Sequence, residues 1–408
     1  MSYSPPAEIL ERYADLLVNW ALGGGAGISP GETVCVNASE DAKPLFIEVS
    51  KAVWRAGGNV IPRYMPADDA ELSFNRAFYE LASEQQLDFF PERWLLSLIE
   101  QSDHLLHIVG ERDPHALAAV DPVRIMRHQQ TLGPLIAAQD AKESRGELSW
   151  TVALYGTEAM AAEAELTLER YWEQITKACF LDDSDPVARW RAVTEQVHGF
   201  RDALNALPIE RLRMQGPDCD ISFTLGERRR WVAGGGRNVP SFEVFTSPDW
   251  RGTDGWIRFS EPLYAFGQLV RGAELRFENG LVVHADAAHN GALLRQLVAT
   301  ENADRVGEFS LTDRRVSRID HFMASTLYDE NVGGPFGNTH LAVGLSLPVA
   351  YDGDPSQLGP EDRERLGFNT STVHTDIVST TDRTVTATLS DGSQRVIYAD
   401  GQFQLDGV

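Results

Sequence analysis

The sequence predicts an α/β amino-terminal domain with a mainly parallel sheet, followed by an α+β carboxy-terminal domain rich in antiparallel strands. The chain has 408 residues, which exceeds the size at which a single core usually stops growing. Strand and helix patterns alternate through its first half, whereas strand patterns follow one another directly in its second half. We expect the two domains to span residues 1–200 and 201–408.

The first half shows the alternation most clearly. Apolar residues in Ala7–Trp20 recur at helical spacing, and the glycine run 23–25 ends that segment. The stretch ETVCVNAS predicts a buried strand, and the helix pattern after it stops at the glycines 57–58. Further strands are expected at Asn59–Tyr64 and in HLLHIVGE and LSWTVALY. Strands separated by helices in this way are typical of a parallel sheet.

The second half contains two strong hairpin signals. Asn279–Gly280 and Asp391–Gly392 each lie between alternating apolar residues, as in hairpin turns that join antiparallel strands. Only the surroundings of Ala292–Ala299 have distinct helical spacing here. The helical pattern of Leu166–Arg201 is expected to connect the two domains.

Composition narrows the partners and the compartment. Thirty-six Lys and Arg against sixty Asp and Glu give a net charge of −24, which argues against nucleic acid and anionic membranes as partners and favours cations. The three cysteines, Cys35, Cys179 and Cys219, are too scattered for a disulfide framework. No signal peptide and no apolar run of about 18 residues are visible. We therefore expect a cytoplasmic protein.

The stretch GFNTSTVHTDIVST contains the first candidate site residues. Side chains alternate along a strand, so His374 and Asp376 share one face while Val373, Thr375 and Ile377 share the other. A half-exposed strand with a solvated histidine and aspartate has the same pattern. The tripeptide alone does not decide between these interpretations.

Three further segments place polar groups among apolar or small neighbours: RNVPSFEVFTSP with Glu243, RVGEFSL with Glu308 and GNTHLAVG with His340. Burying such groups unpaired is costly, and sharing a cation is one way to satisfy them. Each also has a structural explanation, because the glutamates could lie at strand ends or edges and the histidine could be hydrogen-bonded in a core.

The order Glu, Glu, His, His-x-Asp in these contexts resembles the aminopeptidase T and aminopeptidase S family of metallopeptidases, family M29. The resemblance covers most of the chain through segments LYGTEAMAAEAELTLERYW, GRNVPSFEVFTSP, FENGLVV, VGEFSL, TLYDEN, HLAVG and VHTD. It implies that Glu243, Glu308, His340, His374 and Asp376 are the ligands of two divalent metal ions. It also implies a homodimer with an enclosed active-site cavity.

The sequence departs from the family pattern in two places. The link VGGPFGNT between Asn331 and His340 is longer than expected. The family also has a tyrosine seven residues after this histidine, where the present chain has Leu347. Tyr351 and Tyr328 are the nearby tyrosines that could supply a hydroxyl, and we take Tyr351, together with Glu308, as a catalytic candidate.

The implied function is a dinuclear metalloaminopeptidase that acts on peptides with a free amino terminus. Imidazoles and carboxylates suit zinc, cobalt or manganese, and a hydroxide bridging two such ions would attack the scissile carbonyl. Glu330 in TLYDEN and Arg237 in GRNVP are candidates for supporting groups beyond the ligands.

Two alternatives remain at this point. Proteins resembling this family include mononuclear Fe(II) dioxygenases that open a dihydroxypyridine ring, and His340, His374 and Asp376 would form the triad that such chemistry needs. Glu243 and Glu308 would then be superfluous. The other alternative is a catalytically idle protein that binds a structural metal ion or small amines.

Overall fold

The computed structural model describes residues 3–265 and 268–407, which divide into two compact units. The first unit comprises the described part of Met1–Arg191 with Gly235–Pro240, and the second comprises Ala192–Gly234 with the described part of Ser241–Val408. Helix α10 (Pro186–Asn205) runs across this division. The domain boundary after residue 200 stays a prediction. None of the helices in the described ranges is both long and apolar enough to cross a membrane.

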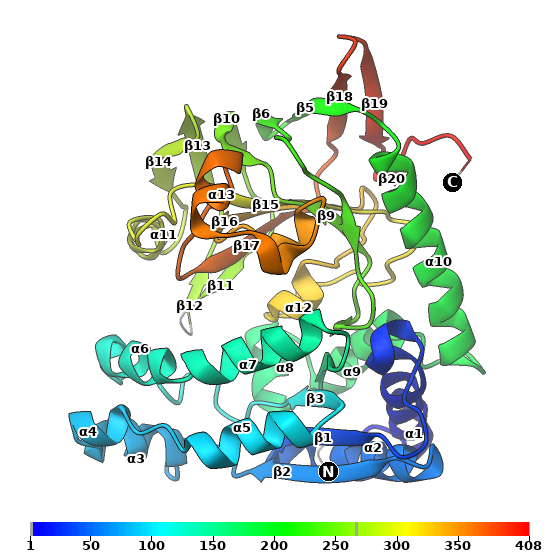
Figure 1. Ribbon diagram of the computed structural model, residues 1–408, viewed down its shortest axis with the longest axis vertical. Coiled ribbons are helices and arrows are strands. Elements are labelled where there is room, and N and C mark those ends of the chain that lie inside the picture. Colours follow the sequence, from blue (N-terminus) through cyan, green and yellow to red (C-terminus); the bar gives the residue numbers. More distant parts are fainter. Residues whose placement is uncertain (1–2, 266–267, 408) are drawn as a thin grey trace. The chain divides into compact units, whose positions relative to one another are not determined.

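The first unit contains the predicted parallel sheet, with strand order β2-β1-β3-β4-β8. Helix α2 packs on β1 and β2, and all three can be followed in blue in Figure 1. The strands are β1 (Thr33–Ser39), β2 (Asn59–Met65), β3 (His104–Val109), β4 (Ser149–Leu154) and β8 (Asn238–Val239). The helices are α1 (Ala7–Leu16), α2 (Lys43–Arg55), α3 (Phe74–Leu81), α4 (Glu84–Leu87), α5 (Glu92–Gln101), α6 (Pro122–Thr131), α7 (Gly133–Ser144), α8 (Glu158–Glu163) and α9 (Leu168–Ala178).

Glycines end the first two helices as the sequence predicts. Helix α1 continues as a π-helical segment, Leu17–Ala21, and the chain then turns at Gly23 and Gly24, which have φ of 65° and 64°. Helix α2 is followed by Gly57 with φ of 82°. These left-handed conformations cost a glycine little because it has no Cβ.

A polar network joins the amino ends of three parallel strands. His104 at the start of β3 is buried, and its Nε2 lies 2.9 Å from Glu32 Oε2, just before β1. Its Nδ1 lies 2.8 Å from the Oγ of Ser149, the first residue of β4. The Gly23 backbone N–H donates to the same Oγ at 2.9 Å. The network therefore connects the glycine turn to the amino ends of the parallel strands.

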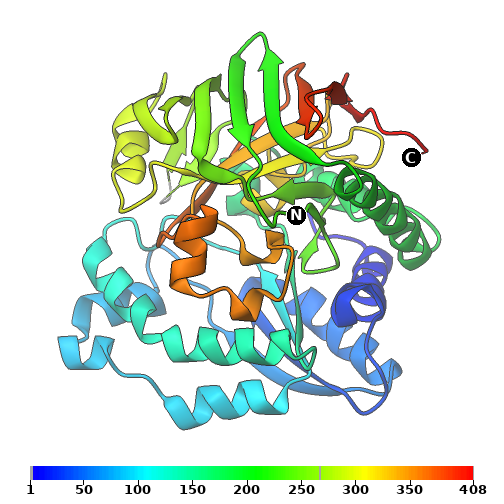
Figure 2. The same cartoon turned by 45° about the horizontal axis from the view of Figure 1, so that its top comes forward.

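The second unit is built from antiparallel sheets, as predicted. The larger sheet has the order β14-β13-β10-β6-β5-β18-β19-β20, and Figure 2 shows β5 and β6 as a long green hairpin. Its strands are β5 (Ile209–Gly216), β6 (Cys219–Thr224), β10 (Asp249–Arg258), β13 (Glu274–Glu278), β14 (Leu281–Asp286), β18 (Thr384–Leu389), β19 (Gln394–Ala399) and β20 (Gln402–Phe403). Strands β11 (Leu263–Ala265) and β12 (Gln268–Val270) form a separate pair.

Both predicted hairpin turns are present, between β13 and β14 and between β18 and β19. Helix α11 (Gly291–Val298) matches the predicted helical segment. The expectation that this is the only helical region of the second half is wrong, because α12 (Thr326–Asp329) and α13 (Pro360–Leu366) are also present. Both are too short for apolar periodicity to show.

A five-stranded antiparallel sheet, β17-β16-β15-β9-β7, has two contrasting faces. Its strands are β7 (Val232–Ala233), β9 (Glu243–Thr246), β15 (Val306–Thr312), β16 (Asn338–Gly344) and β17 (His374–Ser379). One face is apolar and fully buried through Val244, Phe309, Leu311, Leu341 and Ile377. The polar candidate residues occupy the alternate positions, because side chains along a strand point to opposite faces.

A bulge near the start of β15 sets which face Glu308 occupies. Val306 is paired with Val343, but Glu308 is paired with Ala342, so Gly307 is the extra residue. A Cβ on Gly307 would lie 2.3 Å from the Leu345 carbonyl oxygen. Only glycine fits this close approach without movement of the backbone.

We predict that Gly307→Ala destabilises the protein by about 1–3 kcal/mol, because the added methyl group overpacks a rigid site. The control is Gly359→Ala, where no atom lies within 4 Å of the added Cβ. Urea unfolding should show a cost below about 1 kcal/mol for the control, since Ala is only a poorer helix cap than Gly. Equal costs for the two variants would contradict the role assigned to the bulge.

Candidate metal centre

The five residues predicted as metal ligands lie on one face of the five-stranded sheet. Glu243 begins β9, Glu308 is on β15, His340 is on β16, and His374 and Asp376 are on β17. The register pairs Thr312 with Glu243, Ser310 with His340, and Ala342 with Asp376. Alternation along antiparallel strands in this register brings side chains that are far apart in the sequence to the same face.

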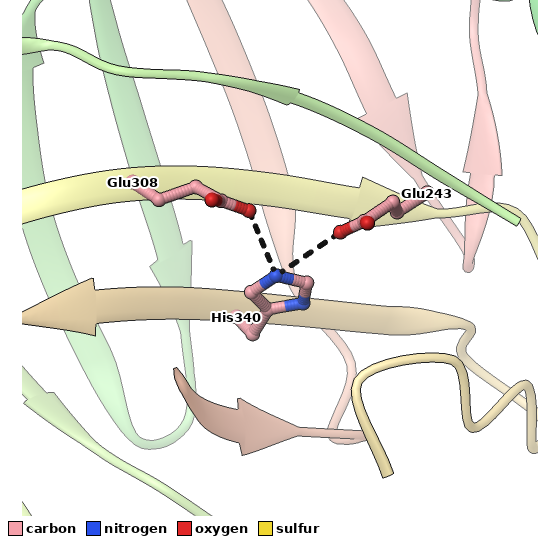
Figure 3. A group of neighbouring side chains, drawn as sticks. All are labelled: Glu243, Glu308 and His340. Atoms are coloured by element: carbon pink, nitrogen blue, oxygen red, sulfur yellow. Dashed lines mark hydrogen bonds and ion pairs between the residues drawn. The ribbon is translucent and has the colours of Figure 1, made fainter. Parts of the chain in front are cut away.

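His340 lies among three carboxylates. Its Nε2 is 3.2 Å from Glu308 Oε1 and 3.4 Å from Glu243 Oε2, and Figure 3 shows both carboxylates pointing at this nitrogen. Asp376 Oδ1 lies 3.9 Å from the same nitrogen. The imidazole is almost completely buried, with a side-chain exposure of 1%.

His374 faces two of the same groups. Its Nε2 is 3.4 Å from Glu308 Oε2 and 3.5 Å from Asp376 Oδ1. Glu308 therefore presents one carboxylate oxygen to each imidazole. The nitrogen and oxygen atoms form two sets, each within 4.8 Å: Glu243, Glu308 and His340, and Glu308, His374 and Asp376. Glu308 belongs to both.

The two imidazoles differ in how the protein orients them. His374 Nδ1 lies 2.7 Å from the Leu345 carbonyl oxygen, so this nitrogen carries the proton and donates it. Its Nε2 is then directed at the carboxylates. His340 Nδ1 is buried and has no hydrogen-bond partner among the residues that the structure describes.

Mutual interactions shift the pKa values of the cluster. Burial lowers the pKa of His374, but the neighbouring Asp376 and Glu308 carboxylates outweigh burial and raise it to about 12. Burial likewise opposes the charged form of His340, yet Glu243 and Glu308 raise its pKa well above the ordinary value. Burial raises the pKa of Glu243. Asp376 is also buried, but the imidazoles of His374 and His340 lower its pKa.

Glu330 is a fourth carboxylate that interacts with this cluster. It follows helix α12, is 7% exposed, and has a pKa raised well above the ordinary value, first by burial and then by the charges of Glu243 and Asp376. Asn331 links it to the strand that carries Glu243: its Nδ2 lies 3.4 Å from Glu330 Oε1, and its Oδ1 accepts from the Phe242 N–H at 2.7 Å. The segment TLYDEN suggested Glu330 as a supporting group, but it suggested no role for Asn331.

The other candidates from the sequence lie elsewhere. The Tyr351 ring is 4.9 Å from the Arg228 guanidinium and packs in a hydrophobic cluster with Phe368. The structure thus places the Tyr351 ring against apolar side chains and the Arg228 guanidinium. Arg237 belongs to the first unit, where it pairs with Glu143 at 2.6 Å. Leu347 donates its backbone N–H to Ser247 Oγ at 2.8 Å.

The donor set fits divalent cations. Without a cation, carboxylates crowded at this distance repel one another in a site with little solvent, and the raised pKa of Glu243 reflects that cost. Imidazole nitrogen and carboxylate oxygen are ligands that zinc, cobalt and manganese accept in proteins. The donor atoms divide into two groups that share Glu308.

Known proteins match the chain over nearly its whole length. A family model described as thermophilic metalloprotease (M29) matches residues 7–403. The chain is 28% identical over 419 residues to aminopeptidase 2 of Geobacillus stearothermophilus, covering 97% of this chain and 98% of the relative. It is 31% identical over 345 residues to aminopeptidase T of Thermus aquaticus, covering 79% and 82%.

Solved structures agree with these sequence matches. The wild-type AmpT structure from Thermus thermophilus superposes with a TM-score of 0.81 at 26% identity, covering 97% of this chain and 99% of that one. A 2,5-dihydroxypyridine dioxygenase from Pseudomonas putida KT2440 has a TM-score of 0.51 at 11% identity, covering 98% of each chain, and shares the fold alone. From these matches and its fold, the chain belongs to the M29 family of metalloproteases and is a metalloaminopeptidase.

Proposed function

We propose that the protein is a dinuclear aminopeptidase in which Glu308 serves both metal ions. The observation that carries this proposal is the orientation of Glu308, whose Oε1 faces His340 and whose Oε2 faces His374. A carboxylate can bridge two ions through its two oxygens. Two separate imidazoles on either side of one carboxylate favour two metal positions over one.

Each position has three protein ligands in this proposal. The first position is defined by Glu243, Glu308 and His340, and the second by Glu308, His374 and Asp376. Zinc, cobalt and manganese all suit these donors. When bound, a pair of such ions lowers the pKa of a shared water towards 7 and polarises the scissile carbonyl of the peptide.

Glu330 is the side chain that we propose for proton transfer. It lies outside both donor sets, yet the charges of Glu243, Asp376 and Glu308 act on it. A buried carboxylate can take a proton from water, and the carboxyl group formed in this way can return that proton to the departing amine. Tyr351 stays a prediction for this role, but its place in a hydrophobic cluster favours Glu330.

The proposed substrates are peptides with a free amino terminus, in line with the aminopeptidase names of the relatives. We also propose a cytoplasmic location, which is supported by three buried cysteines that are all free. Homodimerisation stays a prediction, which the mass of the protein in solution tests. The absence of nucleic-acid and membrane partners also stays a prediction.

Metal stoichiometry combined with a peptide panel tests the proposed function. Two ions per chain and cleavage of unblocked but not N-acetylated peptides are expected. One iron ion with oxygen uptake would instead indicate the dioxygenase, and bound metal without turnover would indicate the idle protein. Either of these results would overturn the proposal.

Glutamine substitutions should separate the bridging glutamate from the proton-transfer glutamate. Glu308→Gln should abolish turnover and lower the metal content, because a neutral amide coordinates weakly. Glu330→Gln should lower kcat by about 10²–10⁴-fold, the usual share of general acid–base catalysis, while two ions remain bound. Elemental analysis and kinetics on the same samples provide the comparison. Loss of metal from Glu330→Gln would mean that Glu330 is a ligand.

The pH dependence of metal binding follows from the raised histidine pKa values. In the metal-free protein the carboxylates keep His374 protonated up to a pKa of about 12, and a metal ion binds only the unprotonated ring. Zinc affinity should therefore keep rising from about pH 6 to about pH 8. With an ordinary histidine ligand the affinity would stop rising near pH 7, because the ring has then lost its proton. Calorimetry in buffers of different ionisation enthalpy counts the released protons. If zinc binding released no protons at pH 8, the raised pKa of His374 would be contradicted.

A further inference from the structure

The two proposed metal positions differ in the support that the protein gives to their ligands. In the second position, His374 is oriented by a hydrogen bond from Nδ1 to the Leu345 carbonyl oxygen. In the first position, His340 Nδ1 has no such partner within the described ranges 3–265 and 268–407. Metal-ligating histidines usually have this second hydrogen bond, which fixes the tautomer and the ring plane.

The first position has a different support, the hydroxyl of Ser310. Its Oγ donates to Glu243 Oε2 at 3.2 Å, and this same oxygen lies 3.4 Å from His340 Nε2. Ser310 is fully buried, lies two residues after Glu308 on the same face of β15, and is paired with His340 on the neighbouring strand. The sheet therefore fixes the backbone from which this hydroxyl reaches Glu243.

The Ser310 hydrogen bond restricts the softest torsion of the Glu243 ligand. The terminal torsion of a glutamate is broad, so an unsupported carboxylate rotates between many orientations. A hydrogen bond from a fixed hydroxyl selects the orientation in which Oε2 points at His340. Partners of this kind change metal affinity by about 10–100-fold when they are removed.

We propose, on the basis of the dinuclear function above, that Ser310 is the positioning residue of the first metal position and that this position fills after the second. The second position has an oriented imidazole and therefore needs less ordering when an ion binds. The first position depends on Ser310 to hold one carboxylate and leaves its imidazole to be ordered by the ion.

Zinc titration of the chelator-stripped full chain by calorimetry tests this proposal. The wild-type protein should bind two ions in unequal steps, and Ser310→Ala should weaken the weaker step by about 10–100-fold without changing the tighter one. Ser310→Thr keeps a hydroxyl and should restore the weaker step. Glu243→Gln should remove the weaker step, which assigns it to the first position.

Ser379→Ala is the matched control. Ser379 is a buried serine on β17 of the same sheet, but it points to the opposite face, where its Oγ accepts from the Ser260 N–H at 3.1 Å. This variant loses a buried hydroxyl without touching a ligand, so both zinc steps should stay as in the wild type. Equal weakening in Ser379→Ala and Ser310→Ala would reduce Ser310 to a structural role and overturn the proposal.

The remaining outcomes separate this proposal from the proposed function. A wild-type stoichiometry of one ion refutes the dinuclear function, and weakening of that single step by Ser310→Ala, with rescue by Ser310→Thr, still supports the positioning role. Two ions with no effect of Ser310→Ala refute the positioning role alone. Loss of the tighter step in Glu243→Gln refutes the order of filling.

Discussion

Repulsion among carboxylates on one sheet face is the constraint on which the rest of the second unit depends. Glu243 and Glu308 are buried and Asp376 is nearly so. The imidazoles of His340 and His374 lie against these carboxylates. Such a group is costly to bury without a cation, and the protein tolerates it because the apolar opposite face of the same sheet fixes the strands. The sheet therefore positions the carboxylates and also prevents them from moving apart.

Much of this arrangement follows from strand alternation. The motif VHTD already places His374 and Asp376 on one face, and the bulge at Gly307 adjusts β15 so that Glu308 joins them. The sheet brings together the residues that the family resemblance implies as ligands.

The sequence predicted the architecture of both halves because the signals there are local. Hairpin turns such as Asn279–Gly280 and helix ends such as Gly57 depend on the conformation of one or two residues. The short helices α12 and α13 were not predicted, because segments of so few residues are too short to show the apolar spacing of a helix. Which of many buried serines supports a ligand depends on strand register, which a single sequence does not encode in a readable way, and Ser310 was missed for that reason.

The positions of Tyr351 and Glu330 also depend on tertiary packing, which the sequence did not predict. Proximity in sequence to His340 suggested Tyr351, but the chain turns its ring into a hydrophobic cluster. Glu330 was considered only as a supporting group, since an isolated glutamate is usually exposed. Its burial beside the cluster is a tertiary property, created by packing of the segment after β15 and by the contacts of Asn331.

The network of Glu32, His104 and Ser149 shows how residue type alone can mislead. These residues have the types of a hydrolytic triad, because the His104 ring lies within hydrogen-bond distance of the Glu32 carboxylate on one side and the Ser149 hydroxyl on the other. Yet the network lies at the amino ends of the parallel strands, opposite the edge where open α/β sheets bind ligands, and its hydroxyl already accepts from the Gly23 backbone. Residue types that serve as catalytic groups in serine hydrolases therefore act here as structural groups, which join the glycine turn to the amino ends of the strands.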